Sequence, residues 1–344
     1  MRALVLEKVP APAAQPLAPR DMQRPRPGPD ELLIAVAACG VCRTELDQID
    51  GRIAPPLLPV VPGHQAVGTV VETGAAVTRF RPGDRAGATW LFSSCGACHH
   101  CRRGDENLCP EFRATDCHTH GGYAEYLVMP ERNAVQIPDE LSGFSRIAPF
   151  MCAGAVGYRS LRLSDTEDGM TLGLFGFGSA HHLVLAMARA KYPARKVFVF
   201  TRNPDEQALA LELGADWAGG IHDEPPSPLD RAIDTTPAWR PVLAALERLR
   251  PGGMLTVNAI RKAEADKNQL LSLDYARHLW MEKRLRTVAN VTRRDAEEFL
   301  ALAASARIEP VVQTYPLEQA NDALAVLRAG RIRGSKVLTI ASHA

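Results

Sequence analysis

Four closely spaced cysteines offer the clearest chemistry in this sequence. Cys95, Cys98, Cys101 and Cys109 follow the pattern C-x2-C-x2-C-x7-C. Four thiolates at this spacing can occupy the corners of one tetrahedron, which is the closed site that structural zinc prefers. Disulfides would close short, strained rings, so buried or free thiols are the remaining alternative. The spacing therefore predicts a structural zinc ion held by a lobe of residues 93–111.

A cysteine and a histidine further upstream could also bind a metal. Cys42 ends the segment Cys39-Gly40-Val41-Cys42, which alone would suit a redox motif, half a zinc site or small buried residues. His64 follows a Pro-Gly turn, where a lone histidine is more often a satisfied core residue. Beside Cys42 and a further isolated cysteine, a metal ligand is the better interpretation of His64.

Five short motifs follow one another along the chain, namely Gly40-Val41-Cys42-Arg43-Thr44-Glu45-Leu46, Pro62-Gly63-His64, Gly83-Asp84-Arg85, the four-cysteine lobe and Gly121-Gly122-Tyr123-Ala124-Glu125-Tyr126. Their order and spacing resemble those of the zinc-dependent medium-chain alcohol dehydrogenases, over a length that runs from Met1 to Leu338. The resemblance implies a catalytic zinc bound by Cys42, His64 and Cys152. Two thiolates and one imidazole would leave a fourth tetrahedral position open for an alcohol oxygen or water. For Cys152, the alternative is a small buried hydrophobic residue.

The resemblance also implies roles for the three residues that follow Cys42. The Thr44 hydroxyl would carry the alcohol proton away from zinc, since a hydroxyl is both a donor and an acceptor. Arg43 would face the cofactor pyrophosphate with its planar guanidinium. Glu45 would accept the free ring N–H of His64. The alternatives are a turn-capping threonine and a solvated surface arginine.

Two positions depart from the pattern of that family. Gln65 follows the ligand histidine where many relatives carry glutamate, and a neutral amide cannot become an anionic zinc ligand. The histidine that often ends the proton relay is also missing. Asp47, Asp50 or water would then accept the proton, and these three alternatives stay open.

Ligand-type and aromatic side chains on both sides of the lobe suggest further parts of a site. Cys117-His118-Thr119-His120 could bind a third metal, but we favour surface histidines, one of which could line a substrate pocket. Trp90, Leu91 and Phe92 precede the lobe, where relatives line the substrate cleft. These three residues are as consistent with core packing as with a hydrophobic substrate.

A glycine-containing turn in the middle of the chain predicts a nucleotide site. The apolar segment 171–175 leads into Gly176-Phe177-Gly178-Ser179 and then into a helical run to Ala190. In such a turn, backbone amides at a helix N-terminus approach a pyrophosphate. His181 occupies the third glycine position of G-x-G-x-x-G. It would either loosen the packing between helix and strand or turn its side chain outward.

The end of the next apolar segment bears on the choice of cofactor. NAD enzymes usually place an acid there to bind the ribose hydroxyls, whereas this chain has Thr201-Arg202-Asn203. Arg202 could pair with a 2′-phosphate, so we favour NADP(H) over NAD(H). The alternatives are a solvated Arg202 and an Asp205 that takes the role of the acid.

The elements that must position these residues follow two patterns. The first part of the chain consists of short strands, such as 32–38, and the Pro-rich stretch from Pro10 to Pro29 is expected to be a surface connection. Strands and helices then alternate, which predicts a parallel sheet with ligands at its carboxyl edge. The predicted strands of that sheet are 171–175, 196–201, 229–235, 252–258 and 285–290.

Pattern and resemblance together imply an α/β fold. It would combine a β-rich, GroES-like catalytic domain with a Rossmann domain that contains a doubly wound parallel sheet. We expect residues 1–150 to form the catalytic domain, 151–288 the nucleotide-binding domain and 289–344 a return to the catalytic domain. In the returning segment, Arg333 would reach the pyrophosphate or cap a helix.

The composition argues against several classes of function. The 344 residues include 40 basic and 39 acidic side chains, without a basic stripe that would suit nucleic acid. No apolar run approaches the roughly 18 residues that a membrane span needs. Eight cysteines without a signal segment favour metal binding in a reducing, cytoplasmic compartment. The resemblance implies a homodimer or a homotetramer.

These observations lead to one prediction and two alternatives. We predict a zinc-dependent alcohol dehydrogenase with two zinc ions per chain. It would transfer hydride reversibly between a primary or secondary alcohol, or the matching aldehyde or ketone, and NAD(P). The first alternative is a reductase of the same fold that prefers NADPH and aldehydes. The second is a non-catalytic nucleotide-binding protein.

Overall fold

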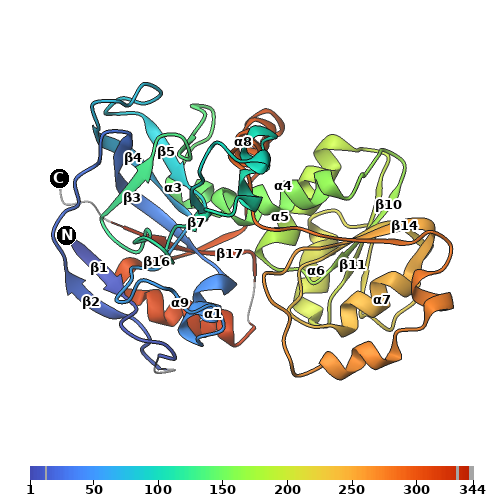
Figure 1. Cartoon of the computed structure of the whole chain (residues 1–344). Helices are drawn as coiled ribbons and strands as arrows, with labels where there is room; N and C mark the ends of the chain where they lie inside the picture. Colours follow the sequence, from blue (N-terminus) through green and yellow to red (C-terminus); the bar gives the residue numbers. More distant parts are fainter. Residues whose placement is uncertain (12–13, 331–332, 341–344) are drawn as a thin grey trace. The chain divides into compact units, whose positions relative to one another are not determined.

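Two compact units make up the protein, as Figure 1 shows for the whole chain. This computed structural model describes residues 1–11, 14–330 and 333–340. The two units, treated separately below, are unit 1, Met1–Ala155 with Asn290–Ala344, and unit 2, Val156–Ala289.

Cys152 lies in unit 1, together with Cys42 and His64. Residues 151–155 pack with unit 1, although the alternating pattern of strands and helices begins in this segment. Arg331, in the predicted C-terminal return, lies outside the described residues. None of the helices in the described ranges is long and apolar enough to cross a membrane.

Unit 1 is rich in short strands. Its main sheet has seven strands, in the order β16-β17-β3-β4-β5-β9, with β8 paired to β3. The strands of unit 1 are β1 (Arg2–Val5), β2 (Ala18–Asp21), β3 (Glu31–Val41), β4 (Ala66–Thr73), β5 (Arg85–Ala88), β6 (Leu91–Ser93), β7 (Arg113–Ala114), β8 (Tyr126–Pro130), β9 (Val135–Gln136), β16 (Val312–Pro316) and β17 (Ser335–Thr339).

The long strand β3 organises this unit and delivers Cys42 to the site. β8 pairs with its first half and β17 with its last four residues, both antiparallel, while β4 pairs along its other edge. Most side chains of β3 are therefore buried. A Cβ at Gly68 of β4 would lie 1.9 Å from the carbonyl oxygen of Ala35, so only glycine permits this close approach. Cys42 follows directly after the last residue of β3.

The expectation for the Pro-rich stretch from Pro10 to Pro29 is wrong in part. Residues Ala18–Asp21 form β2, which pairs antiparallel with β1. Pro19 lies opposite Leu4 in this two-stranded sheet. A proline is tolerated there because an edge strand can leave one side of its backbone without sheet hydrogen bonds.

Helices connect the strands of unit 1, and several of them precede or follow a predicted ligand. They are α1 (Arg43–Ile49), α2 (His99–Arg102), η1 (Glu106–Leu108), α3 (Phe144–Ile147), η2 (Ala148–Met151), the start of α4 (Ala153–Leu163), α8 (Arg293–Ala306), η5 (Leu317–Gln319) and α9 (Ala320–Arg328).

Unit 2 is a doubly wound domain, as predicted. Its six strands are all parallel, in the order β12-β11-β10-β13-β14-β15. The strand order reverses between β10 and β13, where such folds bind ligands at the carboxyl edge. Its elements are β10 (Thr171–Phe175), α5 (Ser179–Lys191), β11 (Lys196–Phe200), α6 (Pro204–Glu212), β12 (Trp217–Gly219), β13 (Leu229–Asp234), α7 (Arg240–Arg248), β14 (Leu249–Val257), η3 (Lys267–Ser272), η4 (Tyr275–Leu279) and β15 (Arg284–Thr287).

The core of unit 2 explains why its strands are continuous apolar runs. Each face of a parallel sheet is covered by helices, so side chains on both faces are buried. The rings of Phe175 and Phe200 stack across β10 and β11 with centroids 4.3 Å apart. The five predicted strands are present, whereas β12 was not predicted, because three residues are too few for a recognisable pattern.

Candidate active site

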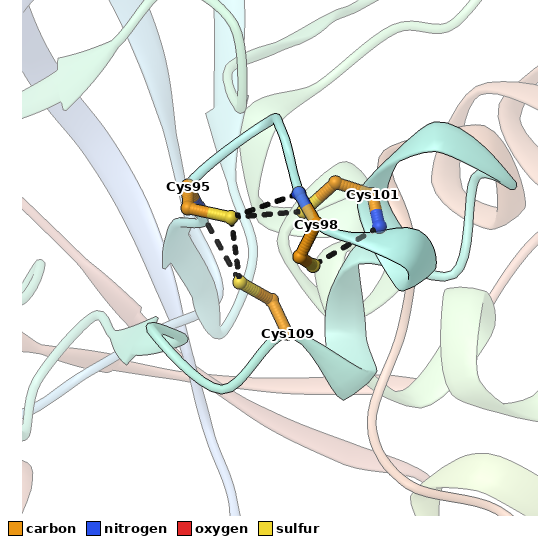
Figure 2. Close-up of side chains that lie close together, drawn as sticks. All are labelled: Cys95, Cys98, Cys101 and Cys109. Atoms are coloured by element: carbon orange, nitrogen blue, oxygen red, sulfur yellow. Dashed lines mark hydrogen bonds between the residues drawn. The ribbon is translucent and has the colours of Figure 1, made fainter.

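The four cysteines of the lobe bring their sulfur atoms together (Figure 2). All four Sγ atoms lie within 4.8 Å of one another. The sulfurs of Cys109 and Cys95 are 3.5 Å apart, and those of Cys95 and Cys101 are 4.0 Å apart. Zn–S bonds of about 2.3 Å would place tetrahedral sulfurs about 3.8 Å apart. The donor set therefore fits one zinc ion, and none of these cysteines forms a disulfide.

Backbone N–H groups point at the sulfurs of this lobe. The N–H of Cys98 donates to the sulfur of Cys95 at 3.3 Å, and that of Glu111 donates to the sulfur of Cys109 at 3.4 Å. Hydrogen bonds from the backbone of Ala97 and Cys98 lower the pKa of Cys95 to about 7. Burial raises the pKa of Cys109 to about 11. A bound cation would favour the thiolate form of both.

A second set of three donors lies elsewhere in unit 1. One donor atom each from Cys42, His64 and Cys152 lies within 4.8 Å of the other two. Cys42 is the residue before α1, and Cys152 lies between η2 and α4. His64 follows Gly63, whose φ of +99° gives the turn its shape. Two half-buried sulfurs and a buried imidazole thus converge from three distant segments.

The two thiols of this set are coupled in their ionisation. Hydrogen bonds from Cys152 and His64 hold the pKa of Cys42 well below its usual value, in spite of burial. The same contact with Cys42, together with burial, holds the pKa of Cys152 well above its usual value. One thiolate and one thiol are therefore favoured without a metal, and binding of a cation would release a proton.

Two carboxylates surround one ring nitrogen of His64. The Nδ1 atom is 2.7 Å from Oδ2 of Asp116 and 3.2 Å from Oε1 of Glu45. Burial lowers the pKa of His64, but the charges of Asp116 and Glu45 outweigh burial and hold that pKa well above its usual value. Because Nδ1 is engaged in this way, Nε2 is the ring atom left for a metal.

Asp116 is a site residue that sequence reasoning missed. It lies 52 residues from His64 in the chain, in the loop of Cys117, His118 and His120, and carries no motif of its own. Cys117 is buried, while the Nδ1 atoms of His118 and His120 accept hydrogen bonds from backbone N–H groups. Within the described chain these three side chains belong to no metal-ligating group.

The helix α1 arranges the residues around Cys42. Oε2 of Glu45 accepts a hydrogen bond from the backbone N–H of Cys42 at 2.8 Å, and Oγ1 of Thr44 lies 3.6 Å from the Cys42 sulfur. Arg43 is exposed. Of the acids expected near the proton relay, Asp47 is hydrogen-bonded to Arg52.

The structure also shows the surroundings of Asp50, the other acid expected near the relay, and of Gln65, which follows the ligand histidine. Asp50 pairs with Arg328 at 2.7 Å. Gln65 is buried and packs against Gly40, since a Cβ on Gly40 would lie 2.8 Å from the Gln65 amide. Both relay acids are therefore tied to guanidinium groups, and Gln65 fills space beside β3.

One aromatic residue before the lobe faces the donor set. The rings of Trp90 and His64 lie with centroids 6.4 Å apart, and Phe112 packs against Trp90 at 5.6 Å. Leu91 and Phe92 are buried in the core instead. Of the three expected substrate-lining residues, only Trp90 is half-buried beside a predicted ligand.

The glycine turn of unit 2 leads from β10 into α5. Gly176 has a φ of +84°, and Gly178 is the residue before the helix. His181 turns inward: it is fully buried, and its Nδ1 lies 2.6 Å from the carbonyl oxygen of Gly176. Burial lowers the pKa of His181 to about 4, so the neutral ring donates this hydrogen bond. His181 therefore ties the turn together, and Ser179 begins the helix.

The end of β11 carries an acid that the sequence did not reveal. Thr201 is buried, and its hydroxyl donates to Glu206 in the first turn of α6. The Gln207 side chain donates to the carbonyl oxygen of Thr201 at 2.7 Å. Arg202, by contrast, is exposed. Glu206 was not predicted because it lies five residues after Thr201 in the sequence. The first turn of α6 brings its carboxylate back to the end of β11.

A buried ion pair lies at the carboxyl end of β13. The ammonium group of Lys262 contacts the carboxylate of Asp234, and both side chains are almost fully buried. Asp234 is opposite Phe175 of β10, at the point where the strand order reverses. Neither residue was predicted, because an isolated Asp and Lys have no distinguishing spacing. Arg333 is exposed in unit 1, before β17.

Known proteins resemble this chain over nearly its whole length. The alcohol dehydrogenase GroES-like domain matches residues 28–139, and the zinc-binding dehydrogenase domain matches residues 215–338. A Mycobacterium tuberculosis protein named "Probable alcohol dehydrogenase AdhA" is 44% identical over 92% of this chain and 90% of its own length.

Two solved structures are similar in fold. The cinnamyl alcohol dehydrogenase SbCAD4 of Sorghum bicolor superposes with a TM-score of 0.87 and 27% identity, over 98% of this chain and 97% of its own. A Sinorhizobium meliloti 1021 structure bound to NADP has a TM-score of 0.83 and 26% identity, over 98% of each chain. On the identity to its curated relative and the two matched domains, the chain belongs to the medium-chain dehydrogenase/reductase family, with alcohol dehydrogenases as its relatives.

Proposed function

We propose that this protein is a zinc-dependent alcohol dehydrogenase that interconverts an alcohol with its aldehyde or ketone. The observation that carries the proposal is the convergence of Cys42, His64 and Cys152 within 4.8 Å. Two sulfurs and one imidazole suit zinc and leave a position for substrate. When bound, zinc supplies a Lewis acid for the substrate oxygen, and the nicotinamide carries the hydride.

The residues beside Cys42 would transfer the proton of the substrate alcohol away from the site. The Thr44 hydroxyl is close to the Cys42 sulfur and can accept one proton while it passes on another. Asp47 and Asp50 both pair with arginines, and burial holds the pKa of Asp47 above its usual value in spite of its hydrogen bond with Arg52. Asp47, Asp50 and water are thus the three candidates for the end of the relay.

We assign a second, structural zinc to the four-cysteine lobe. Its sulfurs are spaced for one tetrahedral ion, and no donor position is left open for substrate. Zinc analysis of the purified chain should give two ions per chain. Cys109→Ser should remove one ion and lower stability, whereas His64→Ala should remove the other and abolish turnover. Full turnover by His64→Ala, or by Cys42→Ala, would contradict the mechanism.

NADP(H) is the cofactor we favour. Gly176, Gly178 and Ser179 form the turn and helix start at which a pyrophosphate could be held by backbone amides, with Arg43 and Arg333 as further phosphate partners. At the end of β11, Arg202 is exposed, and the Glu206 carboxylate accepts a hydrogen bond from the Thr201 hydroxyl. The related Sinorhizobium meliloti structure is bound to NADP. Steady-state rates with NADPH and NADH, on aromatic and short aliphatic aldehydes, test this preference.

The same assays separate the alternative functions. A reductase would turn over aldehydes with NADPH far faster than it oxidises the matching alcohols. A non-catalytic protein would show cofactor binding by fluorescence titration without turnover on any alcohol or aldehyde. The half-buried Trp90 beside His64 favours a substrate with an apolar group, as in the cinnamyl alcohol dehydrogenase that this chain resembles.

A homodimer or homotetramer is the assembly we propose. The last strand of the sheet in unit 2, β15, pairs with β14 only, among the described strands, and all four of its residues are exposed. Exposed edge strands and apolar patches favour pairing with another chain. Light scattering coupled to size exclusion measures the assembly. The exposed apolar side chains of β15 and of the segment that leads into it are Leu271, Leu273, Tyr275, Trp280, Met281 and Leu285.

The cysteines also favour a reducing compartment such as the cytoplasm. All eight are free, although four of them lie within a few ångströms of one another. In an oxidising compartment such neighbours would be expected to pair.

A further inference from the structure

A single buried carboxylate, that of Asp116, connects several parts of the three-donor site. Asp116 is fully buried, and its two oxygens accept four hydrogen bonds. Oδ2 accepts from His64 Nδ1 at 2.7 Å and from the backbone N–H of Gly63 at 3.2 Å. Oδ1 accepts from the Gln48 amide at 2.9 Å and from the indole N–H of Trp90 at 3.2 Å.

The backbone around Asp116 holds the carboxylate in one place. Its φ is +65°, a conformation that aspartate tolerates better than most residues. The next glycine in the loop, Gly121, has no room for a side chain, because a Cβ there would lie 2.7 Å from the Cβ of Asp116. The preceding Thr115 anchors the loop through its hydroxyl to the carbonyl oxygen of Thr89, at 2.8 Å.

Glu45 is the other carboxylate near His64, and its contacts differ. Its Oε2 accepts a hydrogen bond from the backbone N–H of Cys42. Its Oε1 has no hydrogen-bond partner among the described residues and lies 3.2 Å from His64 Nδ1. Asp116 is closer to the ring nitrogen and has all its acceptor positions engaged. The two acids thus have different contacts. Glu45 accepts the backbone N–H of Cys42 at the start of α1, and Asp116 accepts the ring N–H of His64.

We propose that Asp116 is the positioning residue that selects the Nδ1–H form of His64 and holds the Trp90 ring with the same carboxylate. This inference rests on the proposed zinc site at Cys42, His64 and Cys152. Nδ1 must carry the proton when it faces a carboxylate, and Nε2 is then free to bind a metal. Trp90 donates to the same carboxylate. The orientations of the ligand His64 and of the Trp90 ring beside it therefore both depend on Asp116.

Replacing the Asp116 carboxylate by an amide tests this positioning role. Asp116→Asn keeps the size of the side chain but leaves one oxygen for four donors, and its NH2 group cannot accept from His64 or Trp90. The imidazole then loses the contact that selects its metal-binding form. Loss of such a partner typically weakens metal binding or activity by about 10- to 100-fold.

The experiment measures zinc release from the full chain during titration with a chromogenic chelator. The four-cysteine lobe is an internal reference, because it contains none of the altered residues. We expect Asp116→Asn to release the zinc of the three-donor site at about 10- to 100-fold lower chelator concentration, with the lobe unchanged. The matched control is Asp295→Asn, which removes another buried aspartate of unit 1, in the cap of α8.

The possible results are distinct. If the wild-type chain binds only the zinc of the lobe, the proposed function itself fails. If it binds both ions and Asp116→Asn retains both with wild-type affinity, the role of Asp116 is refuted. A larger loss in Glu45→Gln than in Asp116→Asn would also refute it and assign the ring to Glu45.

A second measurement needs no change at Asp116 and therefore does not depend on whether that variant folds. Proton–nitrogen correlation spectra of the zinc-loaded chain with 15N-labelled histidine report which ring nitrogen carries a proton, and His64→Gln identifies the signal. A proton on Nδ1 of His64 supports the proposal, and a proton on Nε2 overturns it.

Discussion

Gly63 precedes the ligand histidine and allows a sharp test of how the backbone holds the site. Its φ is +99°, a conformation that residues with a side chain rarely adopt. A Cβ at this position would lie 2.4 Å from the Tyr123 ring and 2.9 Å from the Cys39 sulfur, and both of those residues are fully buried. Gly63→Ala therefore adds two separate penalties to the folded state.

The magnitudes can be separated with a matched control. Backbone strain at such a φ costs about 1–3 kcal/mol, and forcing extra atoms into a packed core costs about 1–3 kcal/mol more. Gly83 has a φ of +98°, and a Cβ there would meet no atom of the described residues within 4 Å. Gly83→Ala should therefore show the backbone penalty alone, and the difference between the two variants gives the cost of the clash.

Thermal unfolding and zinc content together provide the assay. For a unit of roughly 200 residues, 1 kcal/mol corresponds to about 2–4 °C in Tm. Gly63→Ala should lower Tm by at least about 4 °C, and by more than Gly83→Ala does. Only Gly63→Ala should also lose zinc from the three-donor site, since His64 is the next residue. Equal losses of stability in both variants, with both zinc ions retained, would refute this reasoning.

Three further predictions concern unit 2. Burial lowers the pKa of both His181 and His182 to about 4, against about 6.5 in the unfolded chain. The unfolded state therefore binds more protons between these values, and stability is lost as pH falls from 6.5 toward 4, by about 3 kcal/mol per histidine. Urea unfolding of His182→Leu should depend less on pH over this window, and an unchanged pH profile would contradict this. Arg202→Ala should raise the KM for NADPH by about tenfold or more and leave that for NADH nearly unchanged; a parallel change in both would exclude recognition of the 2′-phosphate. Lys262→Met should destabilise the protein by about 3–5 kcal/mol, because Asp234 is left as an unpaired buried charge, and adding Asp234→Asn should restore much of the loss in denaturant titrations; no recovery would show that the pair is not the cause.

Local features of the fold were predictable because they depend on neighbouring residues. The four cysteines of the lobe lie within one short segment, so their spacing alone indicates a shared ion. The strands of unit 2 are continuous apolar runs because both faces of their sheet are buried. The strand β2 was missed because its Pro19 is typical of a connection, and only the pairing with β1 explains why it is tolerated.

The set of Cys42, His64 and Cys152 was predictable only in part. Cys42, His64 and Cys152 carry ligand-type side chains, but nothing in their spacing says that they meet. Resemblance to a family suggested the set, and the path of β3, the turn at Gly63 and the end of η2 bring it together.

The sequence alone determined the types of donor, the glycine turn and the alternation of strands and helices, because each of these depends on residues close in the chain. Tertiary structure alone decided which carboxylate holds His64, which acid reaches the end of β11 and which way His181 points. Asp116 and His64 are 52 residues apart, and Glu206 reaches Thr201 through the first turn of α6. Hydrogen bonds between distant segments depend on where the packed core places each backbone, and side-chain identity at a single position carries no record of that placement.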